Sequence, residues 1–252
     1  MKNTTGVLFG RLMKHILRSP DTIITVALVP IVMMLMFVYV FGGAVKMSLG
    51  DNVNYVNYQL PGILIMAIAS GIAYTAMRLF MDMQKGGLFE RFSSMPIGRS
   101  SVLWSHVLTS LISNMLTVVI IFLVALIMGF RSSAGILAWL AAAGILVLLT
   151  LALTWVAVIP GIMAKSMEGA TTFSYPLLFL PFLSSAFVPT ETMPKVVRVF
   201  AENQPVTSIV ESIRALLNSE PVGNNIWIAL AWCVGIIVVA YILAMKVYRR
   251  RI

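Results

Sequence analysis

The stretch from Ser100 to Phe130 decides the class of fold, and its sequence is SSVLWSHVLTSLISNMLTVVIIFLVALIMGF. It contains no Asp, Glu, Lys or Arg, and it exceeds the roughly 20 apolar residues that cross about 30 Å of hydrocarbon as a helix. Only helices and closed barrels satisfy their backbone hydrogen bonds in lipid. Barrel strands alternate polar and apolar residues, whereas Val118-Val119-Ile120-Ile121-Phe122-Leu123-Val124 does not. This stretch is therefore predicted to be a transmembrane helix.

Further stretches without charged residues occur along the rest of the chain. Of the 252 residues, 60% are hydrophobic and 11% are charged, whereas soluble proteins carry about 25% charged residues. We therefore expect one all-α integral membrane domain over residues 1–252, with lipid bilayer around six transmembrane helices. The predicted spans are 22–45, 52–77, 100–130, 132–164, 169–190 and 221–245.

Lysine and arginine gather on one side of the predicted spans. Thirteen of the 18 fall at the two ends of the chain and in the loops after the second and fourth spans. With the nearby carboxylates counted, this side carries the whole net charge of +9. The positive-inside rule assigns it to the cytoplasm, so both termini are expected there. Topology explains the basic charge, and no nucleic acid partner is expected.

Two cytoplasmic segments have a pattern of their own. In residues 1–20, Leu8, Leu12 and Ile16 recur at helical spacing with basic residues on another face, which predicts an amphipathic helix in the membrane interface. The loop over 84–99 is longer than a connector needs. Its apolar residues recur every three or four positions before Pro96, which predicts a short helix along the membrane surface. This helix either docks a partner or lies in the interface without one.

The segment after the fifth span is rich in proline. Pro176 and Pro181 lie within the predicted span, and proline removes a backbone hydrogen bond from a helix. We therefore expect span five to be kinked or broken near its outer end. Beyond it, residues 189–220 are predicted to form one or two short re-entrant helices, with apolar positions from Ile209 to Leu217 and with Arg214 on another face. Such a segment would act as an outer gate or as a structural cap.

Apolar residues that could line a path are less specific. The candidates are Phe173, Tyr175, Phe179, Phe182, Met33 and Met34. They fit helix packing, and they equally fit an adaptable surface for varied apolar compounds. Two tyrosines near the outer boundary, Tyr55 and Tyr58, fit an aromatic belt.

Several kinds of chemistry are absent from the sequence. There is no G-x-x-x-x-G-K-[ST] phosphate-binding loop, no HExxH and no G-x-S-x-G, so no catalytic constellation is offered. The single cysteine, Cys233, has no Cys/His cluster around it, and no metal site is predicted. No Asp or Glu lies in the middle of a predicted span, which disfavours ion-coupled carriers. A secondary carrier or channel stays the alternative.

Two ordered motifs carry a resemblance to a known family. The cytoplasmic loop Gly87-Leu88-Phe89-Glu90-Arg91-Phe92-Ser93-Ser94-Met95-Pro96-Ile97-Gly98-Arg99 resembles the G…ER…(M/T)P…R signature of type-two ABC exporter membrane subunits. The outer residues Phe187-Val188-Pro189, Met193-Pro194, Asn203-Gln204-Pro205-Val206-Thr207 and Arg214 resemble the F-x-P…MP…N-P-x-(T/S)…R pattern of the same subunits. Gln204 departs from it by separating Asn203 from Pro205. The likeness covers essentially the whole chain and is greatest to the daunorubicin-resistance, multidrug-type permeases.

This resemblance implies a division of labour. It implies a permease in a bacterial plasma membrane that binds no cofactor and pairs with a second copy of itself. Each copy docks one separate ATPase chain that holds ATP and Mg²⁺, so the complex has two ATPase copies. The implied substrate is a hydrophobic drug-like or lipid-like compound. The implied ATPase-coupling residues are Gly87, Phe89, Glu90, Arg91, Phe92, Met95, Pro96 and Arg99. The implied outer-gate residues are Pro189, Met193, Pro194, Asn203, Pro205 and Arg214.

Overall fold

The computed structural model describes residues 20–43, 54–84 and 99–251, together with Gly6, Phe9, Gly10, Leu12 and Met13. Every regular element in these ranges is helical. In chain order they are α2 (Pro20–Met36), η1 (Phe37–Phe41), α4 (Tyr55–Gln84), α6 (Arg99–Ile127), α7 (Ile136–Met163), α8 (Met167–Thr171), α9 (Ser174–Phe179), η2 (Leu180–Leu183), η3 (Thr190–Thr192), α10 (Lys195–Asn203), α11 (Pro205–Asn218) and α12 (Asn225–Arg251). The all-α prediction is confirmed for these residues.

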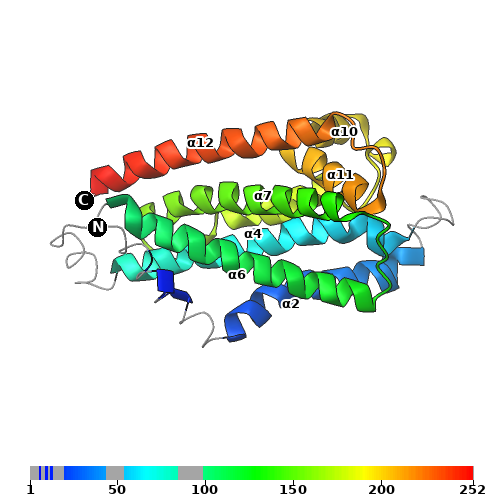
Figure 1. Cartoon of the computed structure of the whole chain (residues 1–252). Coiled ribbons are helices and arrows are strands. Elements are labelled where there is room, and N and C mark those ends of the chain that lie inside the picture. Colours follow the sequence, from blue (N-terminus) through cyan, green and yellow to red (C-terminus); the bar gives the residue numbers. More distant parts are fainter. Residues whose placement is uncertain are drawn as a thin grey trace.

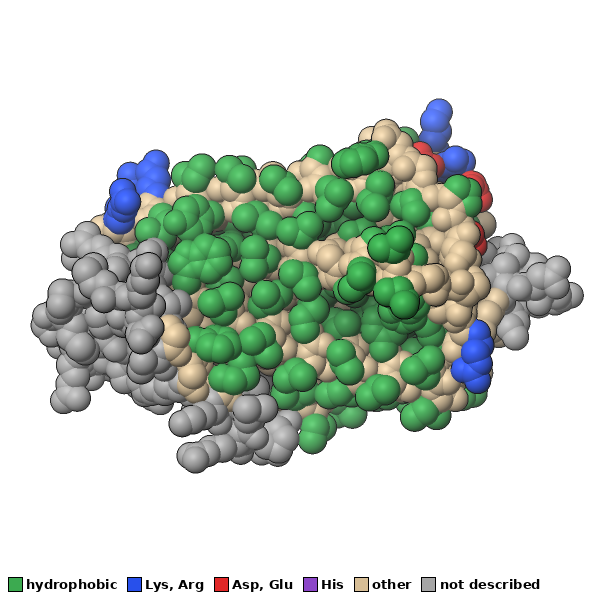
Figure 2. Space-filling model, viewed as in Figure 1, with side chains coloured by type: hydrophobic (Ala, Val, Ile, Leu, Met, Phe, Trp, Pro, Cys, Tyr) green, Lys and Arg blue, Asp and Glu red, His purple; other side chains and the backbone are tan. Residues whose placement is uncertain are grey.

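Within the described ranges, five helices are long and apolar enough to cross a membrane. They lie at Ile23–Phe41, Tyr55–Gln84, Val102–Ile127, Ile136–Met163 and Asn225–Arg250. Figure 1 shows them running alongside one another, with α10 and α11 at one end of the bundle and the end of α12 at the other. We call these the cap end and the C-terminal end. Figure 2 shows apolar side chains over the flank of the bundle and charged side chains at its ends, as expected of a protein surrounded by lipid.

Helix α4 is the centre of the bundle. It packs against α2, α6, α7, α8 and α9, and 67% of its most apolar window is buried, against 17% for the span of α2 and 22% for that of α12. A hydroxyl ladder joins it to its neighbours. Thr75 of α4 donates to the Ser110 hydroxyl of α6 at 2.8 Å, and Ser110 lies 3.2 Å from the Thr154 hydroxyl of α7. Such bonds hold helices together where lipid offers no hydrophobic driving force.

The segment of the predicted fifth span is broken along most of its length. Residues 167–183 form α8, α9 and η2, each far shorter than a membrane crossing. Pro176 lies in α9, and Pro181 stands at the start of η2. The expected break is thus present, but it extends well beyond the outer end of the segment. The part of the chain that the structure describes therefore has five long apolar helices, whereas six spans were predicted.

Candidate functional site

The cap consists of residues 184–220, which contain η3, α10 and α11. Helix α11 turns its apolar stripe inward, with Ile209, Ile213 and Leu217 each 1% exposed or less. The two helices α10 and α11 meet at Gln204, whose side-chain nitrogen donates to the Leu180 and Leu183 carbonyls of η2. Where one or two short re-entrant helices were predicted, the structure has the helices α10 and α11, and their re-entry into the membrane stays a prediction. Gln204, which departs from the family pattern, thereby links the cap to the broken segment by hydrogen bonds.

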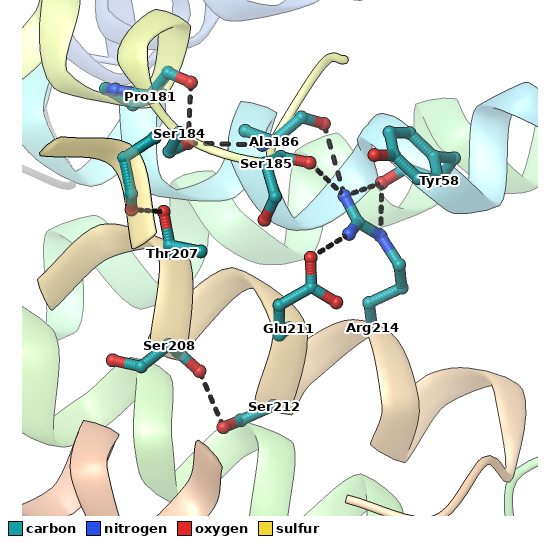
Figure 3. Close-up of polar contacts among 11 residues, drawn as sticks. Tyr58, Pro181, Ser184, Ser185, Ala186, Thr207, Ser208, Glu211, Ser212 and Arg214 are labelled. Carbon is teal, nitrogen blue, oxygen red and sulfur yellow. Dashed lines mark hydrogen bonds and ion pairs between the residues drawn. The ribbon is translucent and has the colours of Figure 1, made fainter. Parts of the chain in front are cut away.

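Arg214 is the central polar residue of the cap. The Arg214 side chain lies off the apolar stripe of α11, yet it is only 6% exposed and is therefore buried. Its Nε and Nη2 donate to the Tyr58 carbonyl of α4 at 3.0 and 2.9 Å, and Nη2 also donates to the Ser185 carbonyl at 2.7 Å. Its Nη1 donates to Glu211 Oε1 at 2.7 Å. Figure 3 shows the guanidinium at the meeting point of these groups.

This arrangement satisfies a buried charge. Taking a guanidinium out of water is costly unless its donors are hydrogen-bonded and its charge is paired. Here the planar group spreads its donors over two segments and a carboxylate, and it stacks on the Tyr58 ring at 3.7 Å from the centroid. Lysine has a single ammonium group and cannot arrange its donors in such a plane. Arg214 therefore crosslinks α11 to the start of α4 and to residues 185–186.

The other predicted gate residues bound the helices of the cap. Pro189 and Pro194 immediately precede η3 and α10, and Pro205 begins α11. Met193 ends η3, and the Asn203 side chain donates to the Val199 carbonyl within α10. These residues shape the cap, whereas Arg214 fastens it to the bundle.

The predicted path residues differ in their burial and in their neighbours. Phe182 lies beside Phe37 and Phe187, whose rings stack at 4.6 Å. Met33 and Phe173 pack on the main apolar core, Met34 is fully buried in it, and Tyr175 and Phe179 are exposed. The substrate path stays a prediction.

Three residues of the cap contact were not identified from the sequence as functional. Tyr58 was predicted to belong to an aromatic belt. In the structure its carbonyl accepts a hydrogen bond from Arg214, and its ring lies against the Arg214 guanidinium. Gly62 allows α4 to approach the cap, since a Cβ there would lie 2.6 Å from the Cβ of Ala186. Ser185 supplies a carbonyl to Arg214. An aromatic residue near a span end is the weak signal that pointed to Tyr58; Gly62 and Ser185 carry none.

Most of the predicted N-terminal interfacial helix and most of the coupling loop lie outside the described residues. This holds for Gly87, Phe89, Glu90, Arg91, Phe92, Met95 and Pro96. Of the coupling residues only Arg99 is placed, at the start of α6.

Comparison with known proteins covers nearly the whole chain. The ABC-2 type transporter family model matches residues 4–218. The chain is 28% identical over 236 residues to the daunorubicin resistance ABC transporter permease protein DrrB1 of Streptomyces coeruleorubidus, covering 92% of this chain and 81% of the relative. It is 25% identical over 244 residues to the probable doxorubicin resistance ABC transporter permease protein DrrC of Mycobacterium tuberculosis, covering 96% and 86%. The chain belongs to the ABC-2 type transporter family and is a transmembrane permease subunit of an ABC transporter.

Proposed function

We propose that this permease forms the export path for hydrophobic drug-like or lipid-like compounds, driven by ATP hydrolysis on a separate ATPase chain. The observation that carries the proposal is the likeness, over more than nine tenths of the chain, to permeases named for daunorubicin and doxorubicin resistance. The sequence adds that the chain has no phosphate-binding loop of its own. The energy for transport must then come from a partner.

The proposed complex has two permease copies and two ATPase copies. Residues 84–99 would dock the ATPase, and Glu90 and Arg91 would provide polar contacts there. Both termini would face the cytoplasm of a bacterial cell, with the cap on the outside. The basic residues near the C-terminal end of the bundle, which are Lys165, Lys246, Arg249, Arg250 and Arg251, support this orientation. The broken segment 167–190 would complete a sixth crossing, because a discontinuous helix is tolerated where protein surrounds it.

The cap is proposed to act as the outer gate. Arg214 attaches the cap to the Tyr58 carbonyl of α4 and to Ser185, and the gate would open by breaking these contacts together. A structural cap is the alternative, in which the same contacts never open. A disulfide that locks the cap to α4 would abolish export in the first case and leave it unchanged in the second.

Recovery of the ATPase is the direct test of the proposed complex. The tagged chain is purified from its native membrane in several mild detergents, and the co-purifying proteins are identified. A chain with a phosphate-binding loop, in roughly equal amount, is the expected result. Recovery of the permease without any ATPase in every detergent would contradict the proposal. Transport that survives ATP depletion would favour a carrier or channel.

Orientation can be tested with cysteine labelling. Cys233 is the single cysteine of the chain and is 1% exposed, so Cys233→Ser provides a blank background. Cysteines are then placed at Lys195 in the cap and at Lys246 near the C-terminus, at opposite ends of the bundle. A membrane-impermeant maleimide on intact cells should label position 195 and should reach position 246 only after lysis. The reverse pattern would contradict the proposed topology.

A further inference from the structure

A cavity of about 530 Å³ opens at the cap end, beside the Arg214 contacts. Its walls come from the start of α4, from residues 185–191 and from the end of α11 with the residues that follow. Its polar lining includes Asn57, Ser185, Glu191, Glu211, Arg214 and Glu220. The volume falls within the roughly 300–1,000 Å³ of small-molecule sites. The sequence predicted no charged pocket among the apolar spans. The structure has a pocket lined by charged residues in the cap.

The charge of this cavity is negative. Three carboxylates and one guanidinium line it. The guanidinium of Arg214 is already paired with Glu211 and bonded to backbone carbonyls. Within the described ranges, neither Glu191 nor Glu220 has an ion-pair partner within 4 Å. These two carboxylates therefore leave the cavity with a negative potential that attracts a cation.

A second feature is independent of the charge. Ser185 lines the cavity and is 4% exposed, yet in the described part of the chain its hydroxyl has no hydrogen-bond partner. The neighbouring Ser184 hydroxyl, by contrast, donates to the Pro181 carbonyl and accepts from the Ala186 amide. Figure 3 shows the Ser185 side chain extending from its segment toward Glu211. A buried hydroxyl left unpaired is costly, so this atom is a ready partner for a ligand group.

The geometry favours an organic cation over a metal ion. Among the described residues no group of three or more His, Cys, Asp or Glu stands close enough to hold a metal. An alkylammonium group needs less: one or two carboxylates for its charge and oxygen acceptors for its N–H groups. Pro189 and the edge of Tyr58 supply apolar surface for the rest of such a molecule.

We propose that this cavity binds the ammonium group of apolar amine compounds, through Glu191, Glu220 and the Ser185 hydroxyl. The inference deepens the proposed function, on which its transport consequence rests: amines would be preferred among the exported compounds. The binding itself is a property of the single chain.

The test measures binding to the full chain in lipid nanodiscs, with empty nanodiscs subtracted. The probes are dansylcadaverine, which carries a primary amine, and its N-acetyl derivative, which is neutral. A primary alkylamine is charged at pH 7 because its pKa is close to that of lysine, about 10.4. The amine should bind roughly five- to tenfold more tightly than the acetylated probe, as two solvent-exposed ion pairs can provide. Equal binding of the two probes would overturn the proposal.

Three variants locate the effect. Glu191→Gln combined with Glu220→Gln should remove most of the preference for the amine, and Ser185→Ala should weaken amine binding about two- to tenfold through one lost hydrogen bond. Glu202→Gln is the matched control, because Glu202 is an acidic cap residue that pairs with Arg198 and does not line the cavity. An equal effect of Glu202→Gln would overturn the assignment to this cavity.

The same probes separate this inference from the proposed function. Both are loaded into vesicles that contain the permease with its ATPase, and ATP-dependent transport is measured. Amine-selective binding without transport of either probe would contradict the proposed function and would still support amine binding in the cavity. Transport of both probes without selective binding would contradict the cavity alone.

Discussion

The guanidinium of Arg214 lies 3.7 Å from the ring centroid of Tyr58 and also donates two hydrogen bonds to the Tyr58 carbonyl. The two residues are separated by 156 positions in the chain. One side chain therefore joins the cap to the central helix of the bundle by charge, by hydrogen bonds and by stacking. Among the described residues no ion pair joins the cap to a long helix, so this link is made by the carbonyl and the ring of Tyr58.

Replacing Arg214 should loosen the cap. Arg214→Ala leaves Glu211 and several carbonyls without their donor, at a cost of about 2–5 kcal/mol. Arg214→Lys keeps the charge but loses the fork, so it should recover only part of the stability. Thermal unfolding in detergent measures the cost, and hydrogen exchange of α11 should rise while that of α12 does not. Arg198→Ala is the control, because its pair with Glu202 is exposed and screened by solvent, so its loss should change stability little. An Arg214→Ala protein as stable as this control would contradict the role of the crosslink.

Gly62 should be intolerant of a side chain. A Cβ at this position would stand 2.6 Å from the Cβ of Ala186, so Gly62→Ala should destabilise by about 1–3 kcal/mol through overpacking. Gly144→Ala should be neutral or slightly stabilising, because no heavy atom lies within 4 Å and alanine favours the helix. Combining Gly62→Ala with Ala186→Gly should restore much of the loss in thermal unfolding. Additive losses in the double variant would show that the two residues do not compete for the same space.

The long spans could be predicted from the sequence because composition alone specifies them. A run without charge over more than 20 residues has few alternatives in lipid, and α2, α4, α6, α7 and α12 all arise from such runs. The fifth run was predicted to be a span kinked or broken near its outer end, because hydropathy shows the apolar run but does not show how far a backbone break extends. Its prolines signalled a break, but the extent of the break depends on the packing of α8 and α9 against α4.

The cap contact could not be predicted in the same way. The apolar stripe of α11 places Arg214 on another face, which in an isolated helix would be the exposed face. In the structure that face meets the start of α4, and burial of the arginine becomes favourable only because Tyr58 and Ser185 offer carbonyls there. The family resemblance identified Arg214, but only the tertiary structure shows what it binds.

The hydroxyl ladder of Thr75, Ser110 and Thr154 should contribute modestly to stability. Hydrogen bonds between membrane helices average about 0.6 kcal/mol, so Ser110→Ala, which breaks two contacts to other helices and one from Asn114 within α6, should cost roughly 1 kcal/mol or somewhat more. Thr75→Val in the Ser110→Ala background should then cost less than it does alone. This non-additivity in thermal unfolding is the signature of a shared network. Ser113→Ala, one turn along α6 and outside the ladder, is the control, and an equal loss there would contradict the ladder.

Glu90 is the residue on which coupling to the ATPase is expected to depend. The surface-helix prediction places Glu90 and Arg91 as its exposed charges, where a partner would reach them. Glu90→Ala should abolish ATP-dependent export and weaken recovery of the ATPase roughly tenfold or more, as the loss of an interface hot spot does. Membrane insertion should be unchanged, because the substitution removes a charge outside the spans. Glu168→Ala is the matched control, since Glu168 is exposed in the first turn of α8 and belongs to neither motif. Normal export together with normal ATPase stimulation in the Glu90→Ala complex would exclude this residue from coupling.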